Sequence, residues 1–506
     1  MMITAPRSPA RVSNVANTLA RNKLGVPSVV FFVMAAAAPL TVIAGGATAG
    51  WAITGQISMP IAYVFVAAVL AIFAVGFVAM SRHVLGAGAF YAYIAQGLGR
   101  PAGTGAAFIA VMAYNAMQIG LYGGFAVVLA QFLKAHTGLS VHWLPCALVG
   151  WLLVSIFGQL RVDLNGRVLA VLLVAECAVA ALFSAVMIGH PADGNLSFAT
   201  LNPSLLWATG IGATLVTAIT GYVGIESTVV FSEETKDPRR TVARATFIAV
   251  GIIGLLYGGA AWAMSVATGP ERIVERATSD GTQLIFNLTS PYVGNTIITL
   301  GELLFITSLF AALLAFHNTV ARYAYALGRE RVLPAAFGRT SRRNSAPWVG
   351  SLAQSILALA VLVCYAVAGA DPYVHLFFWV TVIGGLGVLI LMVLTSAAVV
   401  AYFTRDARGE SPYRVFAAPA LATLVLGWVL YTTIKEFDIL LGVAPTDPLR
   451  WWIPAAYLIA AVLGVVWALA LRTSSPDAYA SIGRGSNLAQ PAATSQPAPA
   501  HAASRA

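Results

Sequence analysis

Three glutamates, Glu176, Glu226 and Glu302, lie inside long apolar stretches of the chain. A charged side chain at the centre of a bilayer costs about 2.5–3.5 kcal/mol on insertion scales, so such residues face the protein interior. They are typical of ion and substrate pathways, and the structural alternative is a neutral carboxyl that hydrogen-bonds a neighbouring helix. These three carboxyl groups are therefore the first candidates for chemistry.

Glycine interrupts the apolar stretch that carries Glu226, which reads Gly221-Tyr222-Val223-Gly224-Ile225-Glu226. The missing Cβ of glycine permits a break in a helix. A break within hydrocarbon is tolerated only where the freed backbone lines a cavity or binds a ligand. The pattern predicts a binding site at Tyr222, Val223, Gly224 and Ile225. Glu226 either belongs to this site or tethers the broken helix by accepting backbone N–H groups.

A second break is predicted in the first apolar stretch, which contains Ala35, Ala36, Ala37, Ala38, Pro39, Leu40 and Thr41. Pro39 has no N–H, so the carbonyl of Ala35 loses its helical partner, and Ala38 is pushed away from helical geometry. A simple kink is the alternative. Two broken segments at corresponding positions, five spans apart, favour a transporter with its site at the membrane midplane.

Other polar residues accompany these breaks. Asn115 and Gln118 share a helix face with Tyr122, and form either a pocket wall or a contact between helices. Glu302 is expected at an outer gate or in a structural contact. Thr307 and Ser308 are expected to help bind a sodium ion together with carbonyl groups of the first span. His317 is interpreted as a helix-packing residue.

The elements that must position these residues are membrane spans. The chain has 506 residues, of which 59% are hydrophobic and 9% charged, against about 25% charged in soluble domains. About twelve apolar runs are long enough to cross a bilayer, and the first is interpreted as a retained span rather than a signal peptide. The runs are 26–49, 57–80, 103–133, 141–160, 167–189, 205–231, 246–268, 293–327, 347–369, 374–403, 416–434 and 452–471.

Basic residues give the orientation. With the N-terminus inside and the spans alternating, 24 of the 29 Lys and Arg residues fall on the cytoplasmic side and five outside. The net charge of +10 therefore reflects topology, and no nucleic-acid partner is expected. Cys146, Cys177 and Cys364 show no paired spacing. Phosphate-binding, zinc and nucleophile-elbow motifs are absent, so we predict neither an enzyme nor a cofactor nor a metal site.

The charged end of the sixth apolar run resembles a signature of the amino acid–polyamine–organocation (APC) superfamily of permeases. The similar residues are Gly224-Ile225-Glu226, Ser232 to Arg240, and Arg244-Ala245. Gly86 to Tyr91 and Arg322 to Arg329, followed by Leu333-Pro334, are similar to two further segments of that family. The resemblance covers about residues 20–470.

The resemblance implies a five-plus-five inverted repeat of the leucine-transporter type, with spans 1 and 6 broken and spans 11 and 12 outside the repeat. It implies that the backbone of Ala36, Ala37, Ala38, Pro39 and Thr41, and of Tyr222 to Ile225, holds the carboxylate and amine of an amino acid. The alanines of span 1 and Ala243 depart from the family pattern, which has glycines and a proline there.

A third departure concerns proton coupling. Many members of the superfamily carry a lysine nine residues after a basic residue of span 5, and counting nine from Arg167 gives Glu176. Nine helical residues rise about 14 Å, which places Glu176 near the middle of the membrane. We therefore predict that Glu176 binds and releases the coupling proton.

The sequence as a whole predicts an all-α polytopic membrane protein with about twelve transmembrane helices. The expected divisions are a cytoplasmic segment 1–22, repeats at 23–190 and 205–403, spans 11 and 12 at 414–472, and a disordered cytoplasmic tail at 473–506. We predict a permease of the cytoplasmic membrane, with both termini inside, that imports an amino acid by alternating access with protons or sodium. A putrescine-like polyamine is the alternative substrate, and a channel or a non-transporting sensor on the same scaffold is the alternative class.

Overall fold

The computed structural model describes residues 25–84, 88–159, 166–230, 235, 237–341 and 346–484. The predicted cytoplasmic segment 1–22 lies outside these residues. So do parts of the family-like motifs, namely Gly86, Ala87, Ser232 to Glu234, and Lys236. All the elements described below are helices.

Helices follow the apolar runs of the first half in the predicted order. Span 1 is divided among three helical pieces, and span 4 is a helix of only 15 residues. A short helix, α4 (Ala89–Leu98), connects spans 2 and 3. The bounds of the remaining helices are α1 Val26–Ala37, η1 Thr41–Ala47, α2 Thr48–Thr54, α3 Met59–Ser81, α5 Arg100–Thr137, α6 Trp143–Phe157 and α7 Gly166–Gly189.

The second half repeats this pattern, with span 6 divided and span 8 long. Two helices follow as spans 11 and 12. The bounds of the long elements are α8 Ile211–Tyr222, α9 Ser227–Val230, α10 Pro238–Thr268, α13 Asn295–Arg329, α14 Trp348–Val367, η7 Pro372–Trp379, α15 Val380–Phe403, η8 Tyr413–Ala417, α16 Ala418–Lys435 and α18 Leu449–Ser474. Short helices connect them: η3 Ala199–Leu201, η4 Pro203–Trp207, α11 Ile273–Asp280, η6 Gly281–Gln283, α12 Leu284–Thr289, α17 Phe437–Leu441 and α19 Pro476–Ser481.

Ten helical segments of the described chain are long and apolar enough to cross a membrane. The two other predicted spans are α6, which is apolar but shorter, and the divided span 6. Hydropathy therefore placed all twelve runs on helices, although two of them do not reach a full crossing as continuous helices.

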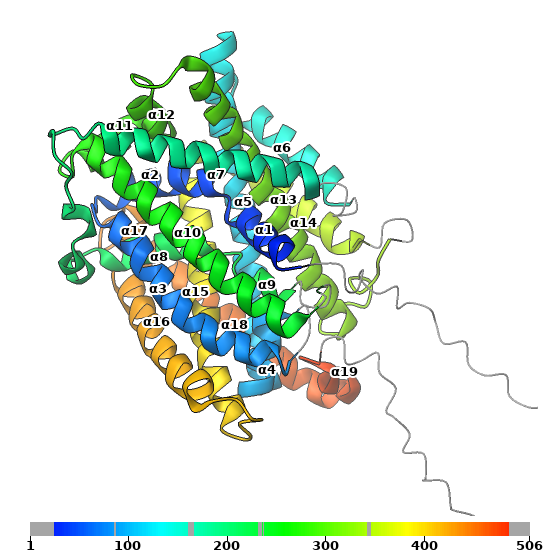
Figure 1. Ribbon diagram of the computed structural model, residues 1–506. Coiled ribbons are helices and arrows are strands. Elements are labelled where there is room, and N and C mark those ends of the chain that lie inside the picture. The colour runs from blue at the N-terminus through cyan, green and yellow to red at the C-terminus, as the bar shows by residue number, and fades with distance from the viewer. Residues whose placement is uncertain are drawn as a thin grey trace, which may run out of the picture.

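The long helix α5 forms the centre of the packing, in contact with α13, α15 and α18. Helix α1 packs against α7, α9, α10 and α13, so it is enclosed by helices of both halves (Figure 1). Helix α10 runs along α3 on one side of the bundle. This arrangement brings the breaks of spans 1 and 6 into the interior, away from the lipid-facing surface.

Span 1 breaks at Ala38. Its backbone is left-handed, with φ 46° and ψ 73°, where α1 ends. An L-residue in this region costs roughly 1–2 kcal/mol. The chain resumes as a helix at Pro39, which needs no helical N–H partner, and Thr41–Ala47 then winds as a π-helix. The break predicted from Pro39 is present, and an alanine occupies the position where glycine would be unstrained.

Span 6 breaks at Val223 to Glu226, between α8 and α9. Gly224 has φ +117°, and a Cβ built on it would lie 2.9 Å from the Cβ of Ala36. The two breaks therefore touch each other. The position requires a positive φ angle and the absence of a Cβ next to Ala36, and glycine is the residue that satisfies both.

The C-terminal region is ordered beyond the predicted start of the tail at 473. Helix α19 follows α18, the Gly483 N–H donates to a carboxylate oxygen of Glu330 at 3.0 Å, and Arg100 lies over the ring of Tyr479. These residues, which belong to the segment predicted as a tail, contact α4, α5 and the end of α13. Residues 485–506 lie outside the described part.

A cluster of charges joins two loops next to the spans. The Glu410 carboxylate lies 3.0 Å from Arg82, 3.6 Å from Arg414 and 3.6 Å from His83. Burial raises the pKa of Glu410, but the hydrogen bond and charge of Arg82 and the charges of His83 and Arg414 outweigh it, so its pKa lies below its usual value. The ionised Glu410 therefore stabilises the folded protein fully at pH values above the pKa that this carboxyl has in the unfolded chain. The stabilisation is lost as the pH falls through the lower pKa of the folded state.

Replacing Glu410 by Gln is expected to lower the free energy of unfolding by about 1 kcal/mol at pH 7. This difference should shrink as the pH falls, because the parent's carboxylate becomes protonated. Thermal melting in detergent over an acid pH series measures the effect. The matched control is Asp406→Asn, whose carboxylate lies in an exposed pair 3.9 Å from Arg408. Equal stability of Glu410→Gln and the parent at pH 7 would contradict the prediction.

Candidate substrate and proton site

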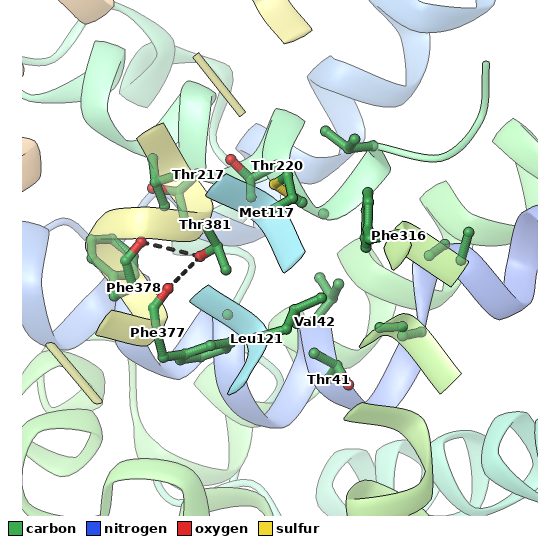
Figure 2. A pocket seen from close by; sticks show the side chains of 18 of the residues that line it. Thr41, Val42, Met117, Leu121, Thr217, Thr220, Phe316, Phe377, Phe378 and Thr381 are labelled. Carbon is green, nitrogen blue, oxygen red and sulfur yellow. Dashed lines mark hydrogen bonds between the residues drawn. The ribbon is translucent and has the colours of Figure 1, made fainter. Parts of the chain in front are cut away.

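A cavity lies between the broken helices and the facing walls of α5, α13, η7 and α15 (Figure 2). It holds about 530 Å³ of space free of protein atoms, including the part open to solvent. Its lining is formed by Ala36, Ala37, Ala38, Thr41, Val42, Gly46, Tyr63, Met117, Leu121, Thr217, Thr220, Gly221, Val223, Ala312, Phe316, Phe377, Phe378, Thr381 and Val382.

The lining side chains are uncharged, and most are apolar or aromatic. Hydroxyl groups of Thr217, Thr220 and Thr381 donate to carbonyls of their own helices, so their hydrogen atoms are already used. The Tyr63 hydroxyl, in contrast, is buried and has no hydrogen-bond partner among the described residues. A buried polar group without a partner is costly, which makes Tyr63 a candidate contact for a bound ligand.

Glu176 reaches from α7 to the break of span 1. Its Oε1 accepts the Leu40 N–H at 2.5 Å and the Ser308 hydroxyl at 2.6 Å. Leu40 lies at the start of the second half of span 1, where N–H groups have no helical acceptor and the helix dipole favours a carboxylate. The Thr41 N–H donates to Ser308 Oγ at 3.2 Å, and the two hydroxyl oxygens lie 3.0 Å apart. Glu176 therefore joins spans 1, 5 and 8 at one point.

Glu226 takes the corresponding position at the break of span 6. Its two carboxylate oxygens accept the Tyr114 hydroxyl of α5 and the Gly224 N–H, the latter at 2.9 Å. The side chain is 3% exposed and is not among the residues that line the cavity. This geometry favours the tethering alternative for Glu226, because the carboxylate holds the broken backbone rather than facing the cavity.

The predicted span 1 and span 6 residues divide into two groups. Ala36, Ala37, Ala38, Thr41 and Val223 line the cavity. The others, Pro39, Tyr222, Gly224 and Ile225, are buried beside it. The Tyr257 hydroxyl donates to the Ala37 carbonyl and so supports the break of span 1, whereas the Tyr222 hydroxyl donates to the Tyr63 carbonyl and joins spans 6 and 2.

Asn115 and Gln118 do not line the cavity either. The Asn115 amide donates to Val111 of its own helix. Gln118 hydrogen-bonds to His317 at 3.0 Å, to Tyr122 and to Gln354, and His317 reaches Ser351 at 2.7 Å. This buried polar cluster connects α5, α13 and α14, as the packing interpretations of Gln118 and His317 predict.

The other α13 candidates lie apart. Glu302 pairs with His136 near the end of α5 at 2.8 Å, in a part-exposed position. Thr307 donates to the Leu304 carbonyl of its own helix, whereas Ser308 belongs to the Glu176 cluster. Of these three residues, the structure brings only Ser308 to the broken helices.

Sequence reasoning missed most of the cavity wall. Met117, Leu121, Phe316, Phe377 and Phe378 are ordinary apolar residues of membrane helices, and no local pattern distinguishes those that face a cavity. Tyr63 lies near the start of α3, where an interfacial tyrosine is common, so the sequence contains no distinguishing signal for it either.

The fold and the site define a multi-pass membrane protein built as a transporter, with the five-plus-five inverted repeat and broken helices 1 and 6 of the leucine-transporter type. A solved manganese transporter of Eremococcus coleocola, in complex with an aromatic bis-isothiourea compound, is similar with a TM-score of 0.58 over 93% of this chain and 99% of that one, at 12% identity. At this identity the likeness supports the fold alone.

Residues 24–467 match the family described as amino acid permease. The chain belongs to this family, within the APC superfamily of permeases. Curated relatives are the low-affinity putrescine importers PlaP of Escherichia coli strain K12 and of Escherichia coli O157:H7, each 26% identical over 238 residues. The similar region covers 46% of this chain and 48% of each relative, so it spans about half their length.

Proposed function

We propose that this permease is a secondary active transporter that imports an amino acid with an apolar side chain, coupled to protons. The observation that carries the proposal is the cavity at the two helix breaks, whose lining side chains are uncharged. An apolar side chain buried against Phe316, Phe377 and Met117 gains hydrophobic free energy of about 1.5–3 kcal/mol for a Leu- or Phe-sized group.

The broken backbone supplies the polar contacts for the substrate amine. Pro39 has no N–H for the Ala35 carbonyl, and the Leu40 N–H points to Glu176 instead of the Ala36 carbonyl. Carbonyl groups at the C-terminal end of a half-helix carry partial negative charge, which favours an ammonium. For the carboxylate, we assign the Thr41 and Tyr63 hydroxyls, because the hydroxyls of Thr217, Thr220 and Thr381 already donate to their own helices.

Glu176 is the proposed proton carrier. It is 5% exposed, its recorded partners are the Leu40 N–H and the Ser308 hydroxyl, and none of these is a basic side chain. A buried carboxyl without a cationic partner is well suited to exchange a proton as the site opens to either side. We further propose that both termini are cytoplasmic, on the basis of the skew of Lys and Arg.

A putrescine-like polyamine is the second candidate, and it is favoured by the E. coli relatives, which are putrescine importers. The cavity weighs against it. Two ammonium groups would enter the site, and no carboxylate lines the wall to pair with the second. An unpaired buried charge costs several kcal/mol, which an amino acid with an apolar side chain avoids.

Uptake into proteoliposomes tests the function. We expect saturable uptake and counterflow of leucine- or phenylalanine-like amino acids, stimulated by an inward proton gradient, and little uptake of putrescine. Preferential uptake of putrescine would replace the first candidate by the second. Unitary currents would indicate a channel, and binding without uptake would indicate a sensor. If none of the amino acids and polyamines assayed is transported or shifts the thermal stability of the protein, the proposed function is wrong.

A further inference from the structure

A continuous line of hydrogen bonds joins the cavity to Glu176. It begins at Thr41, which lines the cavity, and passes through the Ser308 hydroxyl to Glu176 Oε1. All three side chains are buried, at 5%, 1% and 5% exposed. The protonation state of Glu176 can therefore reach the cavity through groups whose hydrogen positions can be worked out.

In the ionised state, these positions follow from counting donors. A carboxylate only accepts, so the single hydrogen of the Ser308 hydroxyl points to Glu176. Ser308 Oγ then accepts from the Thr41 N–H and, having no hydrogen left, also from the Thr41 hydroxyl. The Thr41 oxygen consequently presents only lone pairs to the cavity. This arrangement suits an ammonium and repels a carboxylate.

One added proton on Glu176 reverses the direction of these hydrogen bonds. We place this proton on Oε1, which faces Ser308. The terminal torsion of a glutamate is broad, so the carboxyl group can turn and accept the Leu40 N–H with Oε2. The new O–H donates to Ser308 Oγ, and the hydrogen of Ser308 then turns to the Thr41 oxygen. The Thr41 hydroxyl in turn releases its hydrogen toward the cavity, with one proton gained and every other hydrogen retained.

We propose that Thr41 and Ser308 form a relay that makes the cavity accept a substrate carboxylate only when Glu176 is protonated. The relay gives the proposed function a coupling mechanism, and it rests on Glu176 as the proton carrier. It predicts that protonation of Glu176 increases the affinity for a substrate with a carboxylate, whereas the affinity for an amine without a carboxylate does not increase.

Other titratable groups near Glu176 are few. Its helix α7 packs against α1, α10, α12 and α13, and neither α1 nor α12 carries a titratable side chain. Helix α10 presents Tyr257, whose hydroxyl donates to the Ala37 carbonyl, and the arginines of α10 lie near the N-terminal end of that helix.

On α13, Glu302 and His317 lie about 9 and 14 Å along the helix from Ser308, and each has a partner of its own. On α7 itself, Cys177 is adjacent and Arg167 is nine positions away.

Binding to the purified, full-length protein in detergent tests the relay without a transport cycle. The probes are L-phenylalanine and phenethylamine, which differ by the carboxylate, at pH 6 and pH 8. For the parent we expect L-phenylalanine to bind about tenfold more tightly at pH 6 than at pH 8, within the usual range of coupling between sites. Phenethylamine should show no such gain.

Thr41→Val removes the hydroxyl but keeps the shape and the backbone N–H, and should abolish the pH dependence of L-phenylalanine binding. Thr41→Ser should restore it. The matched control is Thr319→Val on α13, where the hydroxyl donates only to Ala315 of its own helix, and its pH dependence should equal the parent's.

The outcomes separate the relay from the proposed function. If Glu176→Gln abolishes the pH dependence but Thr41→Val retains it, the relay is wrong and Glu176 still carries the proton. If Glu176→Gln retains the parent's pH dependence, the proton carrier itself is wrong. A pH-dependent gain of equal size for phenethylamine would also overturn the relay, because no carboxylate is present to respond. Absence of binding by either probe, with uptake of other substrates, would overturn the substrate class and the relay drawn from it.

Discussion

Glu176→Gln is expected to abolish accumulation driven by a proton gradient, while substrate counterflow stays measurable. A gradient of one pH unit is worth about 1.4 kcal/mol, or tenfold accumulation for each proton carried with the substrate. Proteoliposomes with the parent protein should approach that ratio, and those with the variant should stop at equal concentrations inside and outside. The ratio of internal to external labelled substrate at steady state measures the effect.

The physical reason is that glutamine imitates a protonated Glu176. Its carbonyl oxygen accepts the Leu40 N–H, and its amide N–H donates to Ser308, so the break of span 1 keeps both contacts. Glu176→Ala, in contrast, leaves the Leu40 N–H buried without a partner, and should destabilise the protein by about 1–3 kcal/mol. Comparing the melting temperatures of the two variants separates coupling from folding.

Glu275→Gln is the control for this experiment, because it neutralises a carboxylate that lies on the exposed surface of α11. It should accumulate substrate like the parent. Full accumulation by Glu176→Gln would instead place the coupling proton on another group. Accumulation that follows a sodium gradient in the parent would favour the sodium alternative.

The membrane spans and their breaks could be predicted because they depend on local properties of the chain. Apolar runs of sufficient length form helices, and Pro39 and Gly224 interrupt them through the loss of an N–H and of a Cβ. The four-residue helix α9 and the π-helix after Thr41 were not predicted, since their geometry depends on what the neighbouring helices allow.

The contacts of the site could be predicted only in part. Sequence spacing placed Glu176 deep in a span, but its partners Leu40 and Ser308 come from two other helices. The rotation of α7 and α13 about their axes decides which side chains meet, and that rotation is set by packing over the whole bundle. For the same reason the sequence left open whether Gln118 faces a pocket or another helix, and in the structure it hydrogen-bonds to His317.

The two broken helices are stabilised in the same way, which neither sequence segment indicates alone. Glu176 accepts an N–H at the break of span 1, and Glu226 accepts one at the break of span 6. Glu226 comes from the span that it stabilises and is also held by Tyr114, whereas Glu176 comes from another helix. This difference suits Glu226 for a fixed structural role and Glu176 for a role that changes during transport.

Gly224→Ala is expected to cause the largest loss of stability and transport of any single methyl group added at the site. The backbone angle of +117° costs an L-residue about 1–2 kcal/mol, and the new Cβ lies 2.9 Å from the Cβ of Ala36. Forcing an extra carbon into a packed interior typically costs about 1–3 kcal/mol more. We expect a lowered melting temperature in detergent and initial uptake reduced at least about tenfold, measured per folded molecule.

A double-mutant cycle with Ala36→Gly separates the two causes of this loss. Removing the Ala36 Cβ relieves the contact but leaves the backbone strain at residue 224, so Gly224→Ala combined with Ala36→Gly should recover only the steric part. The coupling energy between the two positions then measures how closely spans 1 and 6 touch in the folded protein. Strictly additive effects would show that the breaks do not meet. In that case the cavity between them, and the site drawn from it, would have to be placed elsewhere.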